Sequence, residues 1–173
     1  RGDRPADVLI VGGGPGGSAA ATLLARQGLA VTVVDRAAFP RDKACSEYMS
    51  PEAVRILARL GALEDLDAAG GVPLEGTIVT AALGARLDGA FARAGVTPFR
   101  ATGLSLSRRL LDARLLDGAR AAGAVVHERT TVEDLVYDDG AVGGAVVRSA
   151  DGARRVLRAR LTIGADGLRS VVA

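Results

Sequence analysis

The first 35 residues alternate between apolar runs and a stretch of small residues, which predicts a strand, a helix and a second strand. The apolar run Ala6–Val11 is bounded on its far side by glycines and predicts a buried strand. Residues 16–27 are rich in alanine and leucine and predict a helix that ends at Gly28. Residues 29–35 are apolar and β-branched and predict the second strand. Two strands joined by one helix over so short a segment indicate a βαβ unit with parallel strands.

The middle of the chain predicts two helices separated by short strands. Ser50 followed by Pro51 is typical of a helix start, and this helix is expected to end before Gly61. The glycine- and alanine-rich residues 64–73 predict a loop. The other expected elements are two short strands over 76–83 and 85–92, a strand around Leu104 and Leu106, and a helix over 108–122 that ends at Gly123.

The last third of the chain predicts strands joined by tight turns. Residues 124–128 predict another buried strand, and three runs then follow over residues 131–137, 141–148 and 153–161. Asp-Gly turns between these runs indicate an antiparallel meander, and residues 161–163 lead into a final turn. The fold class expected from the whole pattern is α/β, a parallel sheet with helices on one face and an antiparallel β-meander on the other.

Composition narrows the class of protein. The chain has 173 residues, which corresponds to about one domain, and 49% of them are hydrophobic, which is enough for a core. The 22 basic and 20 acidic residues are spread along the chain, so nucleic acid is not an expected partner. No apolar run reaches the length of a membrane-spanning helix, and one cysteine excludes an internal disulfide and a thiolate zinc site.

The ends of the chain predict that it belongs to a longer protein. It begins at Arg1 without a methionine and closes on the apolar residues 171–173. No signal peptide is visible, so the expected location is cytoplasmic. We expect residues 1–173 to form one domain that is incomplete, with further segments outside this chain.

The strongest chemical signal is the glycine motif between the first strand and the first helix. Gly12, Gly14 and Gly17 have the G-x-G-x-x-G spacing, directly after a strand and at the start of a helix. In this motif the first glycine allows the tight turn, the second admits a pyrophosphate, and the third allows close packing of helix on strand. The N–H groups of the helix start and the helix dipole would attract the phosphates. A Rossmann-like FAD/NAD(P)-binding domain is therefore expected.

Asp35 fits the acidic residue that completes this fingerprint. It ends the second strand, 23 residues after Gly12. A carboxylate there accepts hydrogen bonds from the adenosine ribose and would repel a 2′-phosphate. The motif alone leaves FAD, NAD and a glycine turn without a ligand open. The antiparallel meander, in place of further βα units, favours FAD over a nicotinamide cofactor.

Five segments together resemble one flavoprotein superfamily along nearly the whole chain. They are DVLIVGGGPGGSAAATLLARQG, VVDR, FPRDKACSEYMSPEAV, SRRLLDARLLDGARAAGA and IGADGLRS. The chain is similar to the N-terminal part of para-hydroxybenzoate-hydroxylase-like monooxygenases, geranylgeranyl reductases and flavin-dependent halogenases. The resemblance implies non-covalent FAD, with NADPH or NADH as a transient reductant and a small-molecule substrate. It also implies that residues 1–173 form one FAD-binding domain that is incomplete, with a C-terminal FAD segment and a substrate domain outside this chain.

The resemblance also implies a reaction class and its alternatives. The first expectation is a NAD(P)H-dependent flavoprotein monooxygenase acting on an aromatic or polyketide-like molecule. The segment from Phe39 to Cys45 favours the alternative, a geranylgeranyl-reductase-like reduction of isoprenoid double bonds. A halogenase and a non-catalytic dinucleotide-binding module are further alternatives. Neither the sequence nor the resemblance assigns the catalytic residues or the oligomeric state.

The resemblance assigns cofactor-binding roles residue by residue. Arg36 would flank the adenine, Cys45 and Ser46 would lie along the ribityl chain and flavin edge, and Val132 would meet the adenine through its backbone. Arg108 would contact the cofactor, and the Asp166-Gly167 pair would lie near the pyrophosphate. The full expected set is Gly12, Gly14, Pro15, Gly16, Gly17, Asp35, Arg36, Cys45, Ser46, Arg108, Val132, Asp166 and Gly167.

Overall fold

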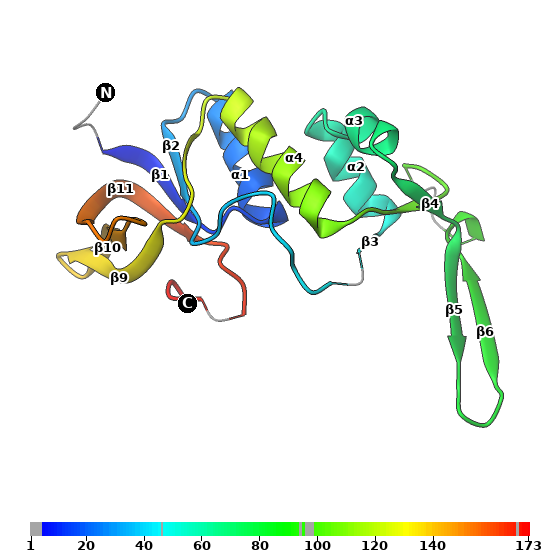
Figure 1. Cartoon of the computed structure of the whole chain (residues 1–173). Coiled ribbons are helices and arrows are strands. Elements are labelled where there is room, and N and C mark those ends of the chain that lie inside the picture. The colour runs from blue at the N-terminus through cyan, green and yellow to red at the C-terminus, as the bar shows by residue number, and fades with distance from the viewer. Residues whose placement is uncertain (1–4, 46, 94, 96–98, 169) are drawn as a thin grey trace. The chain divides into compact units, whose positions relative to one another are not determined.

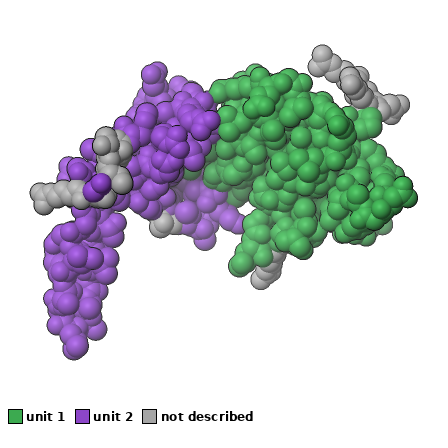
Figure 2. All heavy atoms as spheres, turned by 180° about the vertical axis from the view of Figure 1, so that it is seen from behind, with its two compact units in different colours: residues 1–42, 111–173 green, residues 43–110 purple. Residues whose placement is uncertain are grey.

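The computed structural model describes residues 5–45, 47–93, 95, 99–168 and 170–173 (Figure 1). The chain divides into two compact units (Figure 2). Unit 1 consists of residues 1–42 and 111–173, and unit 2 of residues 43–110. The single FAD-binding domain expected over residues 1–173 stays a prediction.

The centre of unit 1 is a six-stranded sheet in the order β8-β2-β1-β11-β10-β9. The strand β1 pairs in parallel with β2 and with β11, and β2 pairs in parallel with β8, so the predicted βαβ unit is confirmed. The strands are β1 (Ala6–Val11), β2 (Val31–Val34), β8 (Val125–His127), β9 (Thr131–Asp138), β10 (Ala141–Arg148) and β11 (Arg154–Gly164).

The strand β11 joins the parallel and antiparallel parts of this sheet. The sequence predicts separate runs over 153–161 and 161–163, but the structure has one strand of 11 residues. Its first half, residues 154–158, pairs antiparallel with β10, and its second half, residues 159–164, pairs parallel with β1. The meander is therefore hydrogen-bonded directly to the central parallel strands.

Apolar cores cover both faces of the central strands. Successive residues of a strand point to opposite faces, so a strand buried on both sides is a continuous apolar run, as in residues 8–11 of β1. On one face the helices α1 (Pro15–Arg26) and α4 (Arg108–Ala121) contribute Ala21, Leu116 and Ala119 to a core with Val8, Ile10, Val31 and Val33. On the other face Leu9, Val11 and Val34 pack with Val132, Ala145, Val147 and Ala159 of the meander. This arrangement confirms the predicted fold class.

Unit 2 contains two helices, a small sheet and a hairpin. The hairpin of β5 and β6 forms a separate two-stranded ribbon (Figure 1). The elements are β3 (Tyr48–Met49), α2 (Pro51–Arg59), α3 (Leu63–Ala68), β4 (Val72–Leu74), β5 (Gly76–Thr80), β6 (Arg86–Ala90), a 3-10 turn (Phe91–Arg93) and β7 (Gly103–Ser105). β3, β7 and β4 form the small sheet in that order.

Two predictions in unit 2 have opposite outcomes. The helix start at Ser50 is confirmed, because its hydroxyl accepts a hydrogen bond from the N–H of Ala53 at 3.2 Å. The loop expected over residues 64–73 is wrong, because α3 and β4 occupy most of this segment. The helix α3 has Ala62 at its N-cap and no side-chain cap, so no sequence signal marks its start. The fully buried side chain of Leu66 anchors it instead.

Candidate dinucleotide-binding site

A tight turn connects β1 to α1 and can be built only from glycine at two positions. Gly12 has a φ of +106°, and a Cβ built on it would lie 2.4 Å from the carbonyl oxygen of Ala165. A Cβ built on Gly17 would lie 1.9 Å from the carbonyl oxygen of Gly12. Both distances are far below van der Waals contact. A side chain at Gly12 would push away the turn that follows β11, and one at Gly17 would push the helix α1 away from the end of β1. The packing role predicted for Gly17 is confirmed.

The other side of the turn is open. A Cβ built on Gly16 would meet nothing within 4 Å, and one built on Gly14 would meet only the Nη2 atom of Arg41 at 3.6 Å. Gly14 is the N-cap of α1 and provides no side-chain cap, and Pro15 occupies the first turn. The first N–H groups of a helix lack partners inside it and carry partial positive charge. This open, positive helix start has the geometry that an anionic diphosphate requires.

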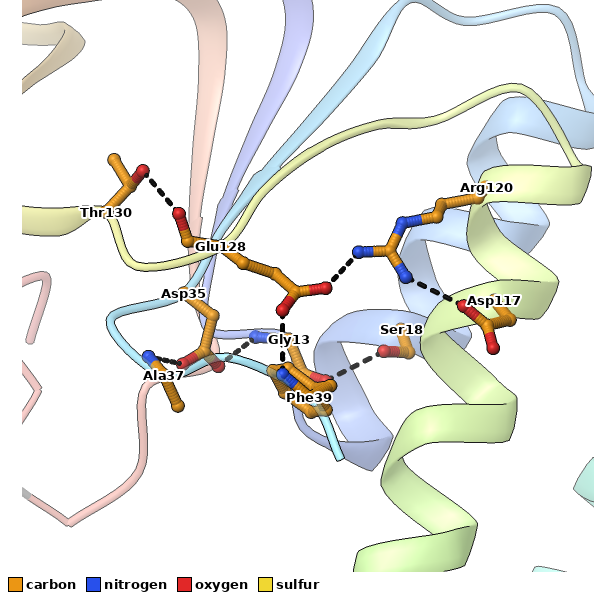
Figure 3. A network of polar contacts seen from close by, with 9 residues as sticks. All are labelled: Gly13, Ser18, Asp35, Ala37, Phe39, Asp117, Arg120, Glu128 and Thr130. Atoms are coloured by element: carbon orange, nitrogen blue, oxygen red, sulfur yellow. Dashed lines mark hydrogen bonds and ion pairs between the residues drawn. The ribbon is translucent and has the colours of Figure 1, made fainter. Parts of the chain in front are cut away.

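Two side chains fix the conformation of the glycine turn. The hydroxyl of Ser18 donates to the carbonyl oxygen of Gly13 at 2.9 Å, and both groups are buried. The Oδ2 atom of Asp35 accepts the N–H of Gly13 at 2.8 Å, and its Oδ1 atom accepts the N–H of Ala37 at 2.8 Å (Figure 3). Asp35 thus connects the glycine turn to the loop that follows β2. A carboxylate has about four acceptor positions, so two hydrogen bonds leave capacity for ribose hydroxyls.

Arg41 is a site residue that the predicted set omits. Its Nη2 atom lies 3.4 Å from the Oδ2 of Asp112, which is fully buried, and 4.0 Å from the Oδ2 of Asp35. Its guanidinium carbon lies 4.8 Å from the centre of the Phe39 ring. Its Nε is buried and has no hydrogen-bond partner among the described residues. The sequence leaves a cofactor contact and a solvated loop equally open for Arg41, because no local spacing shows where this loop brings the guanidinium.

The turn after β11 adjoins the glycine turn. A Cβ on Gly12 would lie 2.7 Å from the backbone nitrogen of Asp166, and the N–H of Ala165 donates to the carbonyl oxygen of Val11 at 2.7 Å. The Oδ2 of Asp166 accepts the N–H of Val171 at 2.8 Å, whereas its Oδ1 is buried without a partner among the described residues. The structure thus brings two predicted motifs together from opposite ends of the chain.

The remaining predicted residues are distributed over both units. In unit 1, Arg36 is exposed and the side chain of Val132 is buried in the meander-side core. In unit 2, Cys45 is exposed, and the backbone N–H of Arg108 donates to the Oε1 of Glu47 at 3.3 Å. Ser46 lies outside the described residues. The cofactor contacts expected of these residues stay predictions.

His127 is the last residue of β8, and the pKa of its imidazole is lowered. Its carbonyl oxygen accepts the N–H of Asp35 at 2.9 Å. Partial burial, and then the positive charge of Arg155, lower the pKa of the His127 imidazole. The Nδ1 atom lies 3.2 Å from the Nη2 of Arg155. A neutral imidazole with an unprotonated Nδ1 can accept a hydrogen bond from Arg155 at this distance.

Comparison with known proteins identifies the family. Residues 5–173 match the FAD binding domain family. The chain belongs to this family. A menaquinone reductase from Mycolicibacterium smegmatis is 39% identical over 171 residues, which cover 96% of this chain and 39% of that protein. Squalene monooxygenase 1,1 from Brassica napus is 32% identical over 177 residues, which cover 98% of this chain and 33% of that protein.

A solved structure agrees with the family assignment. The myxobacterial chondrochloren halogenase CndH superposes with a TM-score of 0.87 at 28% identity, over 96% of this chain and 38% of that chain. The chain therefore spans between a third and two fifths of the length of these proteins. The relatives include reductases, monooxygenases and halogenases, and this confirms the resemblance noted in the sequence. The chain thus belongs to a family of FAD-dependent oxidoreductases.

The residues of this chain fit FAD. The open face at Gly14 and Gly16 leaves room for a diphosphate, and Asp35 offers acceptors to a ribose. The buried unpartnered Nε of Arg41 and Oδ1 of Asp166 lie on the two segments that flank the turn. No helix within the described ranges combines the length and apolarity that a bilayer crossing requires.

Proposed function

We propose that the chain binds FAD through its adenosine diphosphate half at the glycine turn of unit 1. The observation that carries this proposal is the open face of Gly14 and Gly16, with the guanidinium of Arg41 at its edge and the carboxylate of Asp35 behind it. In this pose the N–H groups at the start of α1 donate to the diphosphate, and Arg41 offsets part of its negative charge. Asp35 accepts hydrogen bonds from the adenosine ribose and disfavours a 2′-phosphate.

The protein's own residues in this site bind and orient, while the cofactor supplies the reaction. FAD, when bound, provides two-electron redox chemistry to the substrate. Asp35 and Ser18 hold the turn in its binding conformation before the ligand arrives, so little ordering remains to be done on binding. None of these groups is proposed to react with substrate, and the catalytic residues stay unassigned.

For the reaction, we place two-electron reduction of an isoprenoid quinone-type substrate first. The menaquinone reductase is 39% identical to this chain, against 32% for the squalene monooxygenase. This choice extends the geranylgeranyl-reductase-like alternative that the segment from Phe39 to Cys45 favours. NADPH or NADH is the proposed reductant, and a cytoplasmic location stays a prediction.

The second candidate is a NAD(P)H-dependent monooxygenase acting on an aromatic or polyketide-like molecule. The squalene monooxygenase covers 98% of this chain, which is the observation in its favour. The two candidates share the FAD site and differ in whether the reaction requires O₂.

FAD binding is tested by titrating the purified chain with FAD and following the visible absorption of the flavin. We expect stoichiometric binding to the wild-type chain and none to Gly14→Val, because the new side chain fills the place of the diphosphate. The fold of this variant should be retained, since a Cβ at Gly14 would lie 3.6 Å from the Nη2 of Arg41, which is an ordinary van der Waals distance. Gly118→Val in α4 is the matched control, because a Cβ there meets nothing within 4 Å. Normal FAD binding by Gly14→Val would remove the site assignment.

The reaction class is tested with the FAD-loaded chain reduced by NADPH or NADH without oxygen. Oxidation of the flavin by added menaquinone, with a product that has gained two hydrogen atoms at the quinone ring or at an isoprenoid double bond, supports the reductase. A product that carries an oxygen atom from ¹⁸O₂ supports the monooxygenase instead.

A further inference from the structure

A network of polar contacts lies behind the loop that follows β2. Glu128 follows β8, and its Oε2 accepts the backbone N–H of Phe39 at 2.7 Å (Figure 3). Its Oε1 is paired with Arg120 near the end of α4, and Arg120 also contacts the Oδ1 of Asp117 at 2.7 Å. Glu128 and Phe39 are 89 residues apart in sequence, so this contact joins two distant segments.

Phe39, whose backbone N–H donates to Glu128, contacts the arginine that faces the glycine turn. The ring of Phe39 packs against the helix-side core and lies under the guanidinium of Arg41. That guanidinium is the group nearest to a Cβ built on Gly14. A second contact holds the same loop, because the N–H of Arg129 donates to the carbonyl oxygen of Ala37 at 3.0 Å. Glu128 therefore fixes the loop two residues before the arginine that faces the glycine turn.

We propose that Glu128, supported by Arg120, is a positioning residue for the adenosine diphosphate half of FAD. It contacts no part of the ligand and acts through the backbone of Phe39, which sets the place of Arg41. This inference rests on the proposed function, because it concerns the same site.

The physical argument is preorganisation. Without the carboxylate, the N–H of Phe39 loses its acceptor and the loop spends part of its time in other conformations. When only a fraction of molecules is competent to bind, the apparent Kd rises by the inverse of that fraction. The association rate falls by the same factor, whereas the dissociation rate is unchanged because every ligand contact is intact in the complex. Loss of a direct contact would instead raise the dissociation rate.

The experiment compares Glu128→Ala with Glu133→Ala in the chain. Glu133 is a matched control, because it also forms ion pairs with arginine, in its case Arg148 and Arg154, and its side chain is 24% exposed against 23% for Glu128. Kd values for FAD and for ADP are measured by calorimetry, and the association and dissociation rates of FAD by stopped-flow fluorescence. We expect Glu128→Ala to bind both ligands about tenfold more weakly, through the association rate. Glu133→Ala should stay within about twofold of the wild type.

The variant Glu128→Gln distinguishes a role of Glu128 in positioning the loop from a general loss of the fold. Its amide oxygen can still accept the N–H of Phe39, although the ion pair with Arg120 is lost, so its affinity for ADP should recover most of the difference. If Glu128→Ala does not fold, Arg120→Gln takes its place in the comparison, and it should bind ADP more weakly than Glu133→Ala.

Three results would overturn the proposal. They are wild-type affinity in Glu128→Ala and Glu128→Gln, equal weakening in Glu133→Ala, and a loss that appears only in the dissociation rate. A wild-type chain that binds neither FAD nor ADP overturns the proposed function itself, and with it this inference.

Discussion

The central strand of unit 1 and the hairpin of unit 2 are built from similar residues but have opposite environments. In β1, the neighbours Leu9 and Ile10 are both fully buried. In β5, the neighbours Ile78 and Val79 are 60% and 56% exposed. The strand β1 has a paired strand on each edge and a packed layer on each face, whereas β5 pairs only with β6. Consecutive apolar and β-branched residues therefore specify a strand, and the layers around it decide how much that strand stabilises the fold.

The largest effect on stability is expected from Gly17→Val in unit 1, which is the first test of this comparison. Its Cβ would lie 1.9 Å from a backbone oxygen that cannot move without separating α1 from β1. We expect loss of the cooperative unfolding transition in circular dichroism. The neighbouring variant Gly16→Val is the control, because a Cβ there meets nothing within 4 Å and the fold should persist. A cooperative transition in Gly17→Val at the wild-type temperature would contradict the packing argument.

The second test truncates a leucine in each region. Leu9→Ala removes a fully buried side chain between two layers and should lower the free energy of unfolding by about 2–5 kcal/mol. Leu87→Ala in β6 removes a side chain that is 67% exposed and should change it by less than about 0.5 kcal/mol. Urea unfolding followed by far-ultraviolet circular dichroism measures both. Equal losses would mean that the hairpin is packed in solution.

The third test asks how far unit 2 depends on local signals. Ser50→Ala removes the hydroxyl that accepts the N–H of Ala53 and should cost about 1 kcal/mol. Ser50→Asp keeps an acceptor at the N-cap and should retain the wild-type stability. The same urea titration measures this difference, and an unchanged Ser50→Ala would show that the cap contributes nothing to α2.

The smallest expected effect is a pH dependence in unit 1. Because burial and Arg155 lower the pKa of folded His127, its proton is bound more tightly in the unfolded chain. The stabilising contribution of neutral His127 is therefore present above its unfolded pKa of about 6.5 and is lost as the pH falls through the lower folded value. His127→Gln should unfold at a melting temperature that falls less than that of the wild type between pH 7.5 and pH 5. Parallel curves for the two proteins would remove this assignment.

Local spacing was sufficient to predict the part of the site that is built from one βαβ unit. Gly12, Gly17 and Asp35 all lie within the first strand, helix and strand, so their positions follow from the pattern of that segment. The contact between Glu128 and the loop at Phe39 could not be predicted in this way. It depends on how β8 pairs beside β2, which no local pattern specifies.

Two predictions about the fold were wrong, the loop over residues 64–73 and the division of β11 into two runs, and they have related physical causes. The segment with α3 lacks a capping residue and is rich in glycine and alanine, so local preference favours a loop, while burial of Leu66 stabilises a helix. The strand β11 was divided in two because its residues change from charged to apolar near residue 161. That change reflects a new neighbour, since the strand leaves β10 and continues along β1.

The pairing of β11 with β1 has a consequence for how the protein is made. Ala6 is paired with Ala159, so β1 leaves the ribosome before a partner strand that is synthesised 153 residues later. Until then β1 can pair with β2, but its other edge and the apolar face of Leu9 and Val11 stay exposed to the cell. Sheets closed by such distant strands fold slowly, and their open edges favour association with other chains. A nascent chain that contains β1 but not yet β11 is therefore the form of this protein that most needs a chaperone.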